Sequence, residues 1–331
     1  MQTMIRFALR IATLLCWCTN AAPAQSQSAP ESVRSLERAV AYLQREVPAW
    51  SVKHRCFSCH NNGDAARALF AAQAAGFAVP QQALAGTRQW LAAPDNWKNN
   101  GGDQRFSDQR LAQFQFSMAL SGAARARVIT DVSALQRAAT LTAKQQQTDG
   151  SWPLGTGGIV ASPITYGRHL ATAMGKDLLQ QSDAKMFSSH ITRADRWLRQ
   201  TRPHALPDLA GLLIGLRRAR DTAAIEQRGR CLRLIRAAQD PAGGWGPFAS
   251  HRAEPYDTAI VLLALAQQDA RKPFAKLLQT GRSWLINAQL KDGSWLETTR
   301  PAESESYAHR ISTTAWATLA LIATRTTPHS K

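Results

Sequence analysis

Three stretches of the chain share one pattern: residues 146–152 read QQTDGSW, residues 239–245 read QDPAGGW and residues 289–295 read QLKDGSW. All three fit Q-x3-G-x-W, with Gln146, Gly150 and Trp152, then Gln239, Gly243 and Trp245, then Gln289, Gly293 and Trp295 at the shared positions. Each stretch ends a helical pattern and precedes an apolar one, so the repeating unit is helix, glycine turn, helix.

The residue types in these turns suit a packing role. Glycine permits the tight turn out of a helix, the tryptophan ring can fold back and stack, and the glutamine amide can reach backbone groups left free at helix ends. We therefore expect the turns to hold neighbouring hairpins together. The alternative is that the tryptophans form an aromatic ladder that binds a ligand.

Apolar periodicity and helix-breaking residues predict twelve helices. Their ranges are 31–47, 56–76, 81–93, 108–123, 131–147, 163–175, 184–200, 207–220, 222–239, 255–268, 273–290 and 308–324. The first has a single apolar stripe, as an outer helix should, whereas the segment 258–266 is apolar nearly all round, as an inner helix should be. The alternation predicts an all-α fold of six helical hairpins that close into an α/α toroid, with residues 31–325 as one domain.

The N-terminus has the features of an export signal. Arg6 and Arg10 flank or interrupt a short apolar run, which ends at the small residues Ala22-Pro23-Ala24. We predict a signal peptide over 1–24, a linker over 25–30 and a short tail over 326–331, and hence a periplasmic or secreted bacterial protein. No second apolar segment is long enough to span a membrane.

The chain is basic and has a globular composition. Its 331 residues are 44% hydrophobic, and 40 Lys and Arg against 23 Asp and Glu give a formal charge of +17. Removal of the signal peptide takes away two arginines and no acid, which leaves 38 − 23 = +15. The arginines are spread over many helices without a nucleic-acid-binding module, so we expect solvated faces and no nucleic-acid partner.

Residues 56–60 read CFSCH, the C-x-x-C-H spacing of covalent haem c attachment. In this chemistry Cys56 and Cys59 form thioethers with the two vinyl groups, and His60 is the axial ligand of the iron. The alternatives are a zinc site completed by a distant residue and a disulfide or redox pair. Cys231 lies in a helical apolar pattern and reads as a buried hydrophobe.

The repeat register places this motif at the start of the first inner helix. Tyr166, Asp257 and His309 start or closely precede other inner helices, so all of them are expected at one rim of the toroid. A haem at this rim would lie at the mouth of the central cavity. The candidates for a sixth iron ligand are His169 and His309, together with His54, Met174 and His251.

The three turns, with Ser312-Thr-Thr-Ala-Trp-Ala317 after the last, resemble the prenyltransferase and squalene-oxidase repeats of the squalene-cyclase and protein-prenyltransferase superfamily. The segment CFSCHNN at 56–62 also resembles that of an exported bacterial branch of this terpenoid-cyclase-like group. The resemblance spans nearly all of residues 30–325 and implies the α/α toroid.

Two motifs of the superfamily's enzymes are missing. Hopene-forming cyclases protonate their polyene with a D-x-D-D cluster, whereas Asp103, Asp108, Asp149 and Asp292 are isolated acids. Protein prenyltransferases bind zinc with a D-x-C pair, which is also absent. We therefore expect neither an active squalene-hopene cyclase nor a protein prenyltransferase.

The sequence predicts an exported toroid that carries haem c and works in electron transfer or in oxidation of an unknown substrate. A redox partner or a small apolar molecule would be its partner. One alternative is a zinc-dependent or metal-free lyase or transferase that uses the cavity. The other is a non-catalytic binding scaffold.

Overall fold

The computed structural model describes residues 30–98, 108–154, 160–298, 300 and 306–325. The predicted signal peptide (1–24), the linker up to residue 29 and the tail (326–331) lie outside the described residues. The α-helices are α1 (Glu31–His54), α2 (Ala66–Ala74), α3 (Gln81–Leu91), α4 (Gln109–Arg125), α5 (Val132–Lys144), α6 (Gly167–Asp183), α7 (Ser188–Gln200), α8 (Leu206–Leu216), α9 (Thr222–Ala237), α10 (Pro255–Ala266), α11 (Ala275–Asn287) and α12 (Tyr307–Ala323). A π-helix, η1 (Cys59–Ala65), runs directly into α2, and short 3-10 turns lie at Pro94–Asn96 and Lys272–Phe274.

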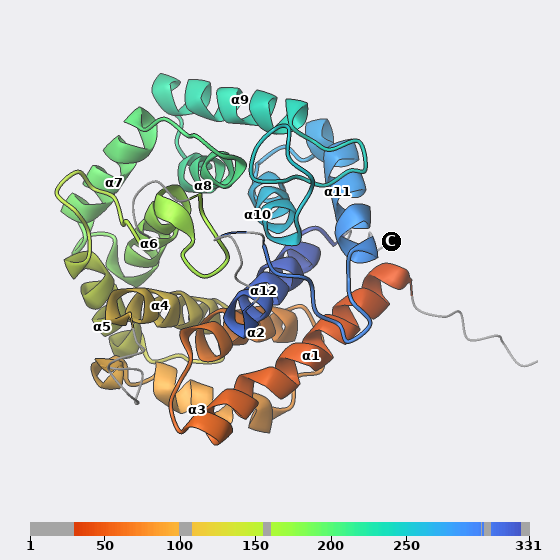
Figure 1. Ribbon diagram of the computed structural model, residues 1–331. Helices are drawn as coiled ribbons and strands as arrows, with labels where there is room; N and C mark the ends of the chain where they lie inside the picture. The colour runs from red at the N-terminus through yellow and green to blue at the C-terminus, as the bar shows by residue number, and fades with distance from the viewer. Residues whose placement is uncertain (1–29, 99–107, 155–159, 299, 301–305, 326–331) are drawn as a thin grey trace, which may run out of the picture.

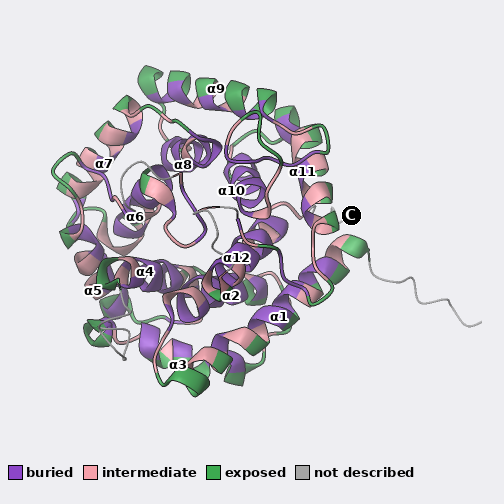
Figure 2. Cartoon of the chain, viewed as in Figure 1, coloured by how far each residue is buried: buried purple, intermediate pink, exposed green. Residues whose placement is uncertain are grey.

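The helices form two concentric rings (Figure 1). The even-numbered helices lie inside and the odd-numbered helices surround them, and α12 packs on η1 and α2 to close the inner ring. Figure 2 shows the inner helices buried and the outer ones exposed on their outward faces. In α10, for example, every residue after Pro255 is buried, whereas α9 buries only Ala224, Gln227, Cys231 and Ile235, a stripe at helical spacing. The predicted all-α toroid is confirmed.

Helix α1 extends beyond its predicted end. The sequence pattern stops at Val47 because Pro48 follows, yet the helix continues through the proline to His54. Two side chains of η1 donate hydrogen bonds to carbonyl groups of this segment. Asn61 Nδ2 donates to Glu46 O at 2.8 Å and Asn62 Nδ2 to Val47 O at 3.4 Å. Tertiary hydrogen bonds thus support the backbone around the proline.

Two further differences concern where inner helices begin and end. The helix predicted from residue 56 starts at Cys59, because the Ser58 hydroxyl accepts the amide hydrogens of His60 and Asn61 and caps it. The helix predicted to end at Gly175 continues to Asp183. A Cβ atom at position 175 would lie 3.1 Å from the Trp152 ring, so this glycine makes room for the tryptophan rather than ending a helix.

The three repeat turns join neighbouring hairpins by close packing and hydrogen bonds. Their glycines have φ between 94° and 109°, and a Cβ atom at any of them would lie within 3.0 Å of a carbonyl oxygen of the following outer helix. Each tryptophan is fully buried and its indole N–H donates to a carbonyl near the end of the preceding outer helix: Trp152 to Thr142, Trp245 to Ile235 and Trp295 to Leu285, at 2.7 to 2.8 Å.

The glutamines join the same turns to the next outer helix. Gln146 Nε2 donates to Gly150 O and to His190 O, both at 2.9 Å. Gln239 makes the equivalent bonds to Gly243 and to α11. These contacts support the predicted packing role, since fully buried rings leave no surface for a ligand ladder.

Across the described part of the chain, no helix is both long enough and apolar enough to cross a membrane.

We expect Trp152→Ala, Trp245→Ala and Trp295→Ala each to lower the melting temperature by several degrees or more. Loss of a buried tryptophan typically costs about 3–5 kcal/mol, and here it also leaves a helix-end carbonyl unpaired. Circular dichroism melts measure the effect, with Leu296→Ala as the control because that side chain is 52% exposed. Tryptophan variants that melt like wild type would contradict the packing role.

Candidate functional site

The N-terminal ends of the inner helices meet at one rim, as predicted. Tyr166 is the N-cap residue of α6, and Asp257 and His309 lie in the first turns of α10 and α12. Burial raises the pKa of Asp257 to about 7, although Arg300 donates to both its carboxylate oxygens at 2.9 and 3.0 Å.

The residues of the C-x-x-C-H motif lie at this rim but turn toward protein atoms. Cys56 and Cys59 are free, partly exposed thiols, with no disulfide between them. Cys56 precedes the helix and its Sγ accepts from Trp50 Nε1 at 3.4 Å. His60 Nε2 lies 3.5 Å from Cys59 Sγ, and Nδ1 lies 3.2 Å from Ser312 Oγ. Axial ligation needs a ring nitrogen that faces the iron, and the nitrogen that Ser312 does not engage, Nε2, faces Cys59 Sγ in this conformation.

The candidate sixth ligands are scattered. His169 has both ring nitrogens engaged, Nδ1 with Asp208 at 2.9 Å and Nε2 with Thr201 at 3.1 Å. His309 Nδ1 is buried without a hydrogen-bond partner among the described residues.

The remaining three candidates are no closer to forming a ligand set. The Met174 sulfur accepts from Arg67, and the exposed His54 and His251 lie beside Trp50 and Phe248. Among the described residues, no group of three His, Cys, Asp or Glu side chains is placed to hold a metal ion.

The side chain that organises the rim is one that the sequence analysis passed over, Asp64. It is fully buried in η1, four residues beyond His60. Ser312 Oγ donates to its Oδ2 at 2.8 Å, Gln115 Nε2 to the same oxygen at 3.2 Å, and the Tyr166 hydroxyl to Oδ1. We call these four side chains, from η1, α4, α6 and α12, the acid cluster.

Burial controls the protonation of the acid cluster. It raises the pKa of Asp64 to about 6, although Arg67, Tyr166 and Ser312 all favour the carboxylate. Burial also lowers the pKa of His60 to about 4, so its imidazole is neutral. With its hydrogen on Nδ1, His60 can donate to Ser312, which donates to Asp64, and this forms a directional hydrogen-bond chain.

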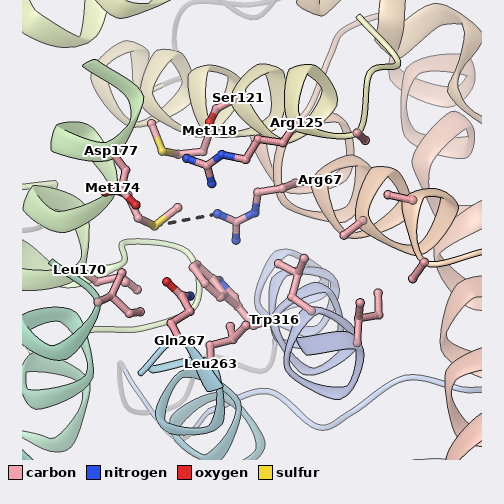
Figure 3. Close-up of a pocket in the computed structure, with 18 residues that line it drawn as sticks. Arg67, Met118, Ser121, Arg125, Leu170, Met174, Asp177, Leu263, Gln267 and Trp316 are labelled. Atoms are coloured by element: carbon pink, nitrogen blue, oxygen red, sulfur yellow. Dashed lines mark hydrogen bonds between the residues drawn. The ribbon is translucent and has the colours of Figure 1, made fainter. Parts of the chain in front are cut away.

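Arg67, three residues beyond Asp64, lines the central cavity (Figure 3). The cavity has a volume of about 480 Å³, within the range of small-molecule sites. Its walls come mainly from the C-terminal halves of inner helices and include the apolar side chains Met118, Leu170, Met174, Ile214, Leu263, Trp316 and Leu319 and the polar side chains Arg67, Ser121, Arg125, Asp177 and Gln267.

Arg67 connects the cavity to the acid cluster. Its guanidinium lies over the Trp316 ring, 4.1 Å from the centroid, and both side chains line the cavity. Arg67 Nη2 is 3.8 Å from Asp64 Oδ1. Asp64 does not line the cavity itself, so Arg67 stands between the carboxyl group and a bound molecule.

Comparison with known proteins places the fold. Residues 207–331 match the family model of the squalene-hopene cyclase C-terminal domain. No curated protein matches the chain by sequence.

Solved structures resemble the chain over most of its length. The type II terpene cyclase MstE from Scytonema, in its apo form, is 15% identical with a TM-score of 0.55, over 88% of this chain and 98% of that one. A MstE variant in complex with geranylgeranyl dihydroxybenzoate (substrate) is 15% identical with a TM-score of 0.57, over 89% and 97%. A protein from Actinoplanes is 15% identical with a TM-score of 0.56, over 88% and 99%. At this identity the likeness shows a shared fold, the toroid of terpene cyclases.

We expect Asp64→Asn to change how stability depends on pH. The folded-state pKa of Asp64 lies near 6, above the ordinary value of 3.8, so wild type loses stability as pH rises from about 4 to about 6. The asparagine variant lacks this loss. The melting temperature of the variant minus that of wild type should therefore rise over this window and level off above it.

The matched control is Asp269→Asn, whose carboxylate is 67% exposed and paired only with Arg220 in the described residues. A flat difference for Asp64→Asn would contradict the raised pKa. The lowered pKa of His60 makes stability rise with pH, opposite to the effect of Asp64. This contribution is common to both proteins, so it cancels when the melting temperature of wild type is subtracted from that of the variant.

Proposed function

We propose that the protein is a terpene-cyclase-like enzyme that transfers a proton to an apolar substrate in the central cavity. The observation that supports the proposal is Asp64, a fully buried acid that Arg67 separates from the cavity and that three hydrogen-bond donors hold. Buried acids with raised pKa values beside a cavity are typical of proton donors. His60 and Ser312 would return the proton to Asp64 through their hydrogen-bond chain.

The acidity of Asp64 favours one kind of acceptor atom. A carboxyl group with a pKa near 6 is a weak acid and suits an oxygen acceptor such as an epoxide, which is more basic than a carbon–carbon double bond. Since the chain also lacks the D-x-D-D cluster, we propose that the enzyme protonates an oxygen function on the substrate.

The carbon skeleton of the substrate is proposed from the cavity and the comparisons. The walls are mostly aliphatic, with Trp316 as the aromatic surface. An aromatic face also stabilises positive charge that develops on a reacting carbon. MstE is described with a geranylgeranyl-bearing substrate. We propose a geranylgeranyl-like isoprenoid for this chain.

We expect the enzyme to open the terminal epoxide of geranylgeraniol. The reaction is run in heavy water, and gas chromatography with mass spectrometry identifies the products. Asp64→Asn should reduce turnover at least about a hundredfold, since general acid catalysis contributes roughly 10²–10⁴. Asp269→Asn should retain wild-type turnover. Squalene, which has no epoxide, should give no cyclic product.

Two results would overturn this proposal. One is that wild type leaves the epoxide unchanged, and the other is that Asp64→Asn turns it over as fast as wild type. Circular dichroism of the variant separates loss of the proton donor from loss of the fold.

A second proposal rests on the C-x-x-C-H motif: export to the periplasm or beyond the cell, with covalent haem c on Cys56 and Cys59. Two free cysteines at one rim, each partly exposed as a residue, favour it. His60 Nε2 would have to turn from Cys59 Sγ to become the axial ligand, while Nδ1 could keep its bond to Ser312. Bound haem would supply redox chemistry at the rim, with a redox partner outside.

We expect protein exported from a host with cytochrome c maturation to retain haem after denaturation and acid-acetone extraction, because thioether bonds survive both treatments. The intact mass should show one added haem and loss of the signal peptide. Cys56→Ala with Cys59→Ala is the matched control and should lack both the haem and its absorbance. A wild-type mass without haem would reject this second proposal and leave the first untouched.

A further inference from the structure

Arg67 is a buried cation whose hydrogen-bonding capacity is almost unused. Its residue is only 8% exposed. Within the described residues, Nε and Nη2 have no hydrogen-bond partner, and the sole partner of Nη1 is the Met174 sulfur at 3.9 Å, a weak acceptor. A guanidinium carries five N–H donors, and none of those of Arg67 meets an oxygen of a described residue within hydrogen-bond distance.

The neighbouring acids do not supply the missing acceptors. Asp64 accepts from Ser312, Gln115 and Tyr166 and stays 3.8 Å from Arg67. Asp177, which lines the cavity, pairs with Arg217 at 2.6 Å. A buried charge without hydrogen bonds is unfavourable. The unused N–H donors of Arg67 can therefore bind an external anion.

Arg67 lines the cavity, so a ligand there can reach its guanidinium group through Nη1. Figure 3 shows Nη1 of Arg67 directed across the cavity toward Met174, with Arg125 beside it. Arg125 is exposed and lines the same cavity, which adds positive charge along the path to Arg67. The other walls are mostly apolar, so the site matches a molecule with one anionic end and an apolar body.

We propose that Arg67 binds the anionic oxygen group, a carboxylate or a phosphate, of an otherwise apolar ligand in the central cavity. This inference rests on the proposed function for the location of the substrate, and it adds the class of the substrate: an isoprenoid acid or phosphate rather than a neutral isoprenoid. Charge-assisted hydrogen bonds from a buried guanidinium make such a preference strong.

The test compares three probes that share one carbon chain: geranylgeranoic acid, geranylgeranyl monophosphate and geranylgeraniol. Isothermal titration calorimetry on wild type should give an affinity for one of the anionic probes at least about tenfold above that for the alcohol, since a hydrogen bond to a charged group contributes roughly 1.5–3 kcal/mol. Comparing the affinities for the acid and for the phosphate identifies which anion the site binds.

Arg67→Gln should remove the preference for the anion while the alcohol binds as before, and Arg67→Lys should recover part of it. Arg220→Gln is the matched control, because Arg220 is 65% exposed on the surface and should leave all affinities unchanged. Melting curves establish that the variants are folded.

The inference is overturned if wild type binds the alcohol as tightly as both anions, if it binds none of the probes, or if Arg67→Gln keeps the preference. It stands if the preference depends on Arg67 but the epoxide is not turned over, in which case only the proposed reaction fails. If the epoxide is turned over without any preference for an anion, the reaction stands and this inference fails.

Discussion

Closure of the helical ring rests on the contact between the last repeat turn and the first outer helix. Gln289 Nε2 donates to Ser35 O at 2.9 Å, and Arg38 donates back to the Gln289 side chain at 2.7 Å. A Cβ atom at Gly293 would lie 2.3 Å from Arg38 O, so the turn can approach α1 only with glycine at that position. This contact joins segments about 250 residues apart at α1, and the packing of α12 on η1 and α2 closes the inner ring beside it.

The acid cluster depends on that closure. Its four side chains come from η1, α4, α6 and α12, and the partners of Asp64 are 51, 102 and 248 residues away along the chain. Ser312 reaches Asp64 because α12 packs against η1 when the ring closes. Gly63 allows η1 to approach α4 closely, since a Cβ atom there would lie 3.3 Å from the Gln115 side chain. The proposed site is therefore a property of the closed toroid and of no single hairpin.

The sequence predicted the fold because the signals for it are local. The Q-x3-G-x-W turns and the helical periodicity each act within about twenty residues, and together they specify hairpins whose number and order lead to a toroid. The sequence did not reveal Asp64, because a lone aspartate in a helix looks solvated until its distant partners are known. Gly175 was misread because the sequence pattern does not show that the Trp152 ring packs against it. The C-x-x-C-H motif drew attention to the correct rim, but the pattern alone could not say that His60 faces Ser312.

Arg67 links recognition to the charge state of Asp64. Its positive charge lowers the pKa of Asp64, while burial raises it, and the second effect is the larger. An anion on Arg67 would offset that positive charge and raise the pKa of Asp64 further, so that the carboxyl group would hold its proton more firmly while the ligand is bound. The other groups around Asp64 do not oppose this change: Tyr166 and Tyr256 keep their protons because burial raises their pKa values, and His60 stays neutral. A ligand with an anionic end would thus favour the protonated acid that the proposed reaction needs, whereas a neutral molecule in the same cavity would leave Arg67 attracting the carboxylate.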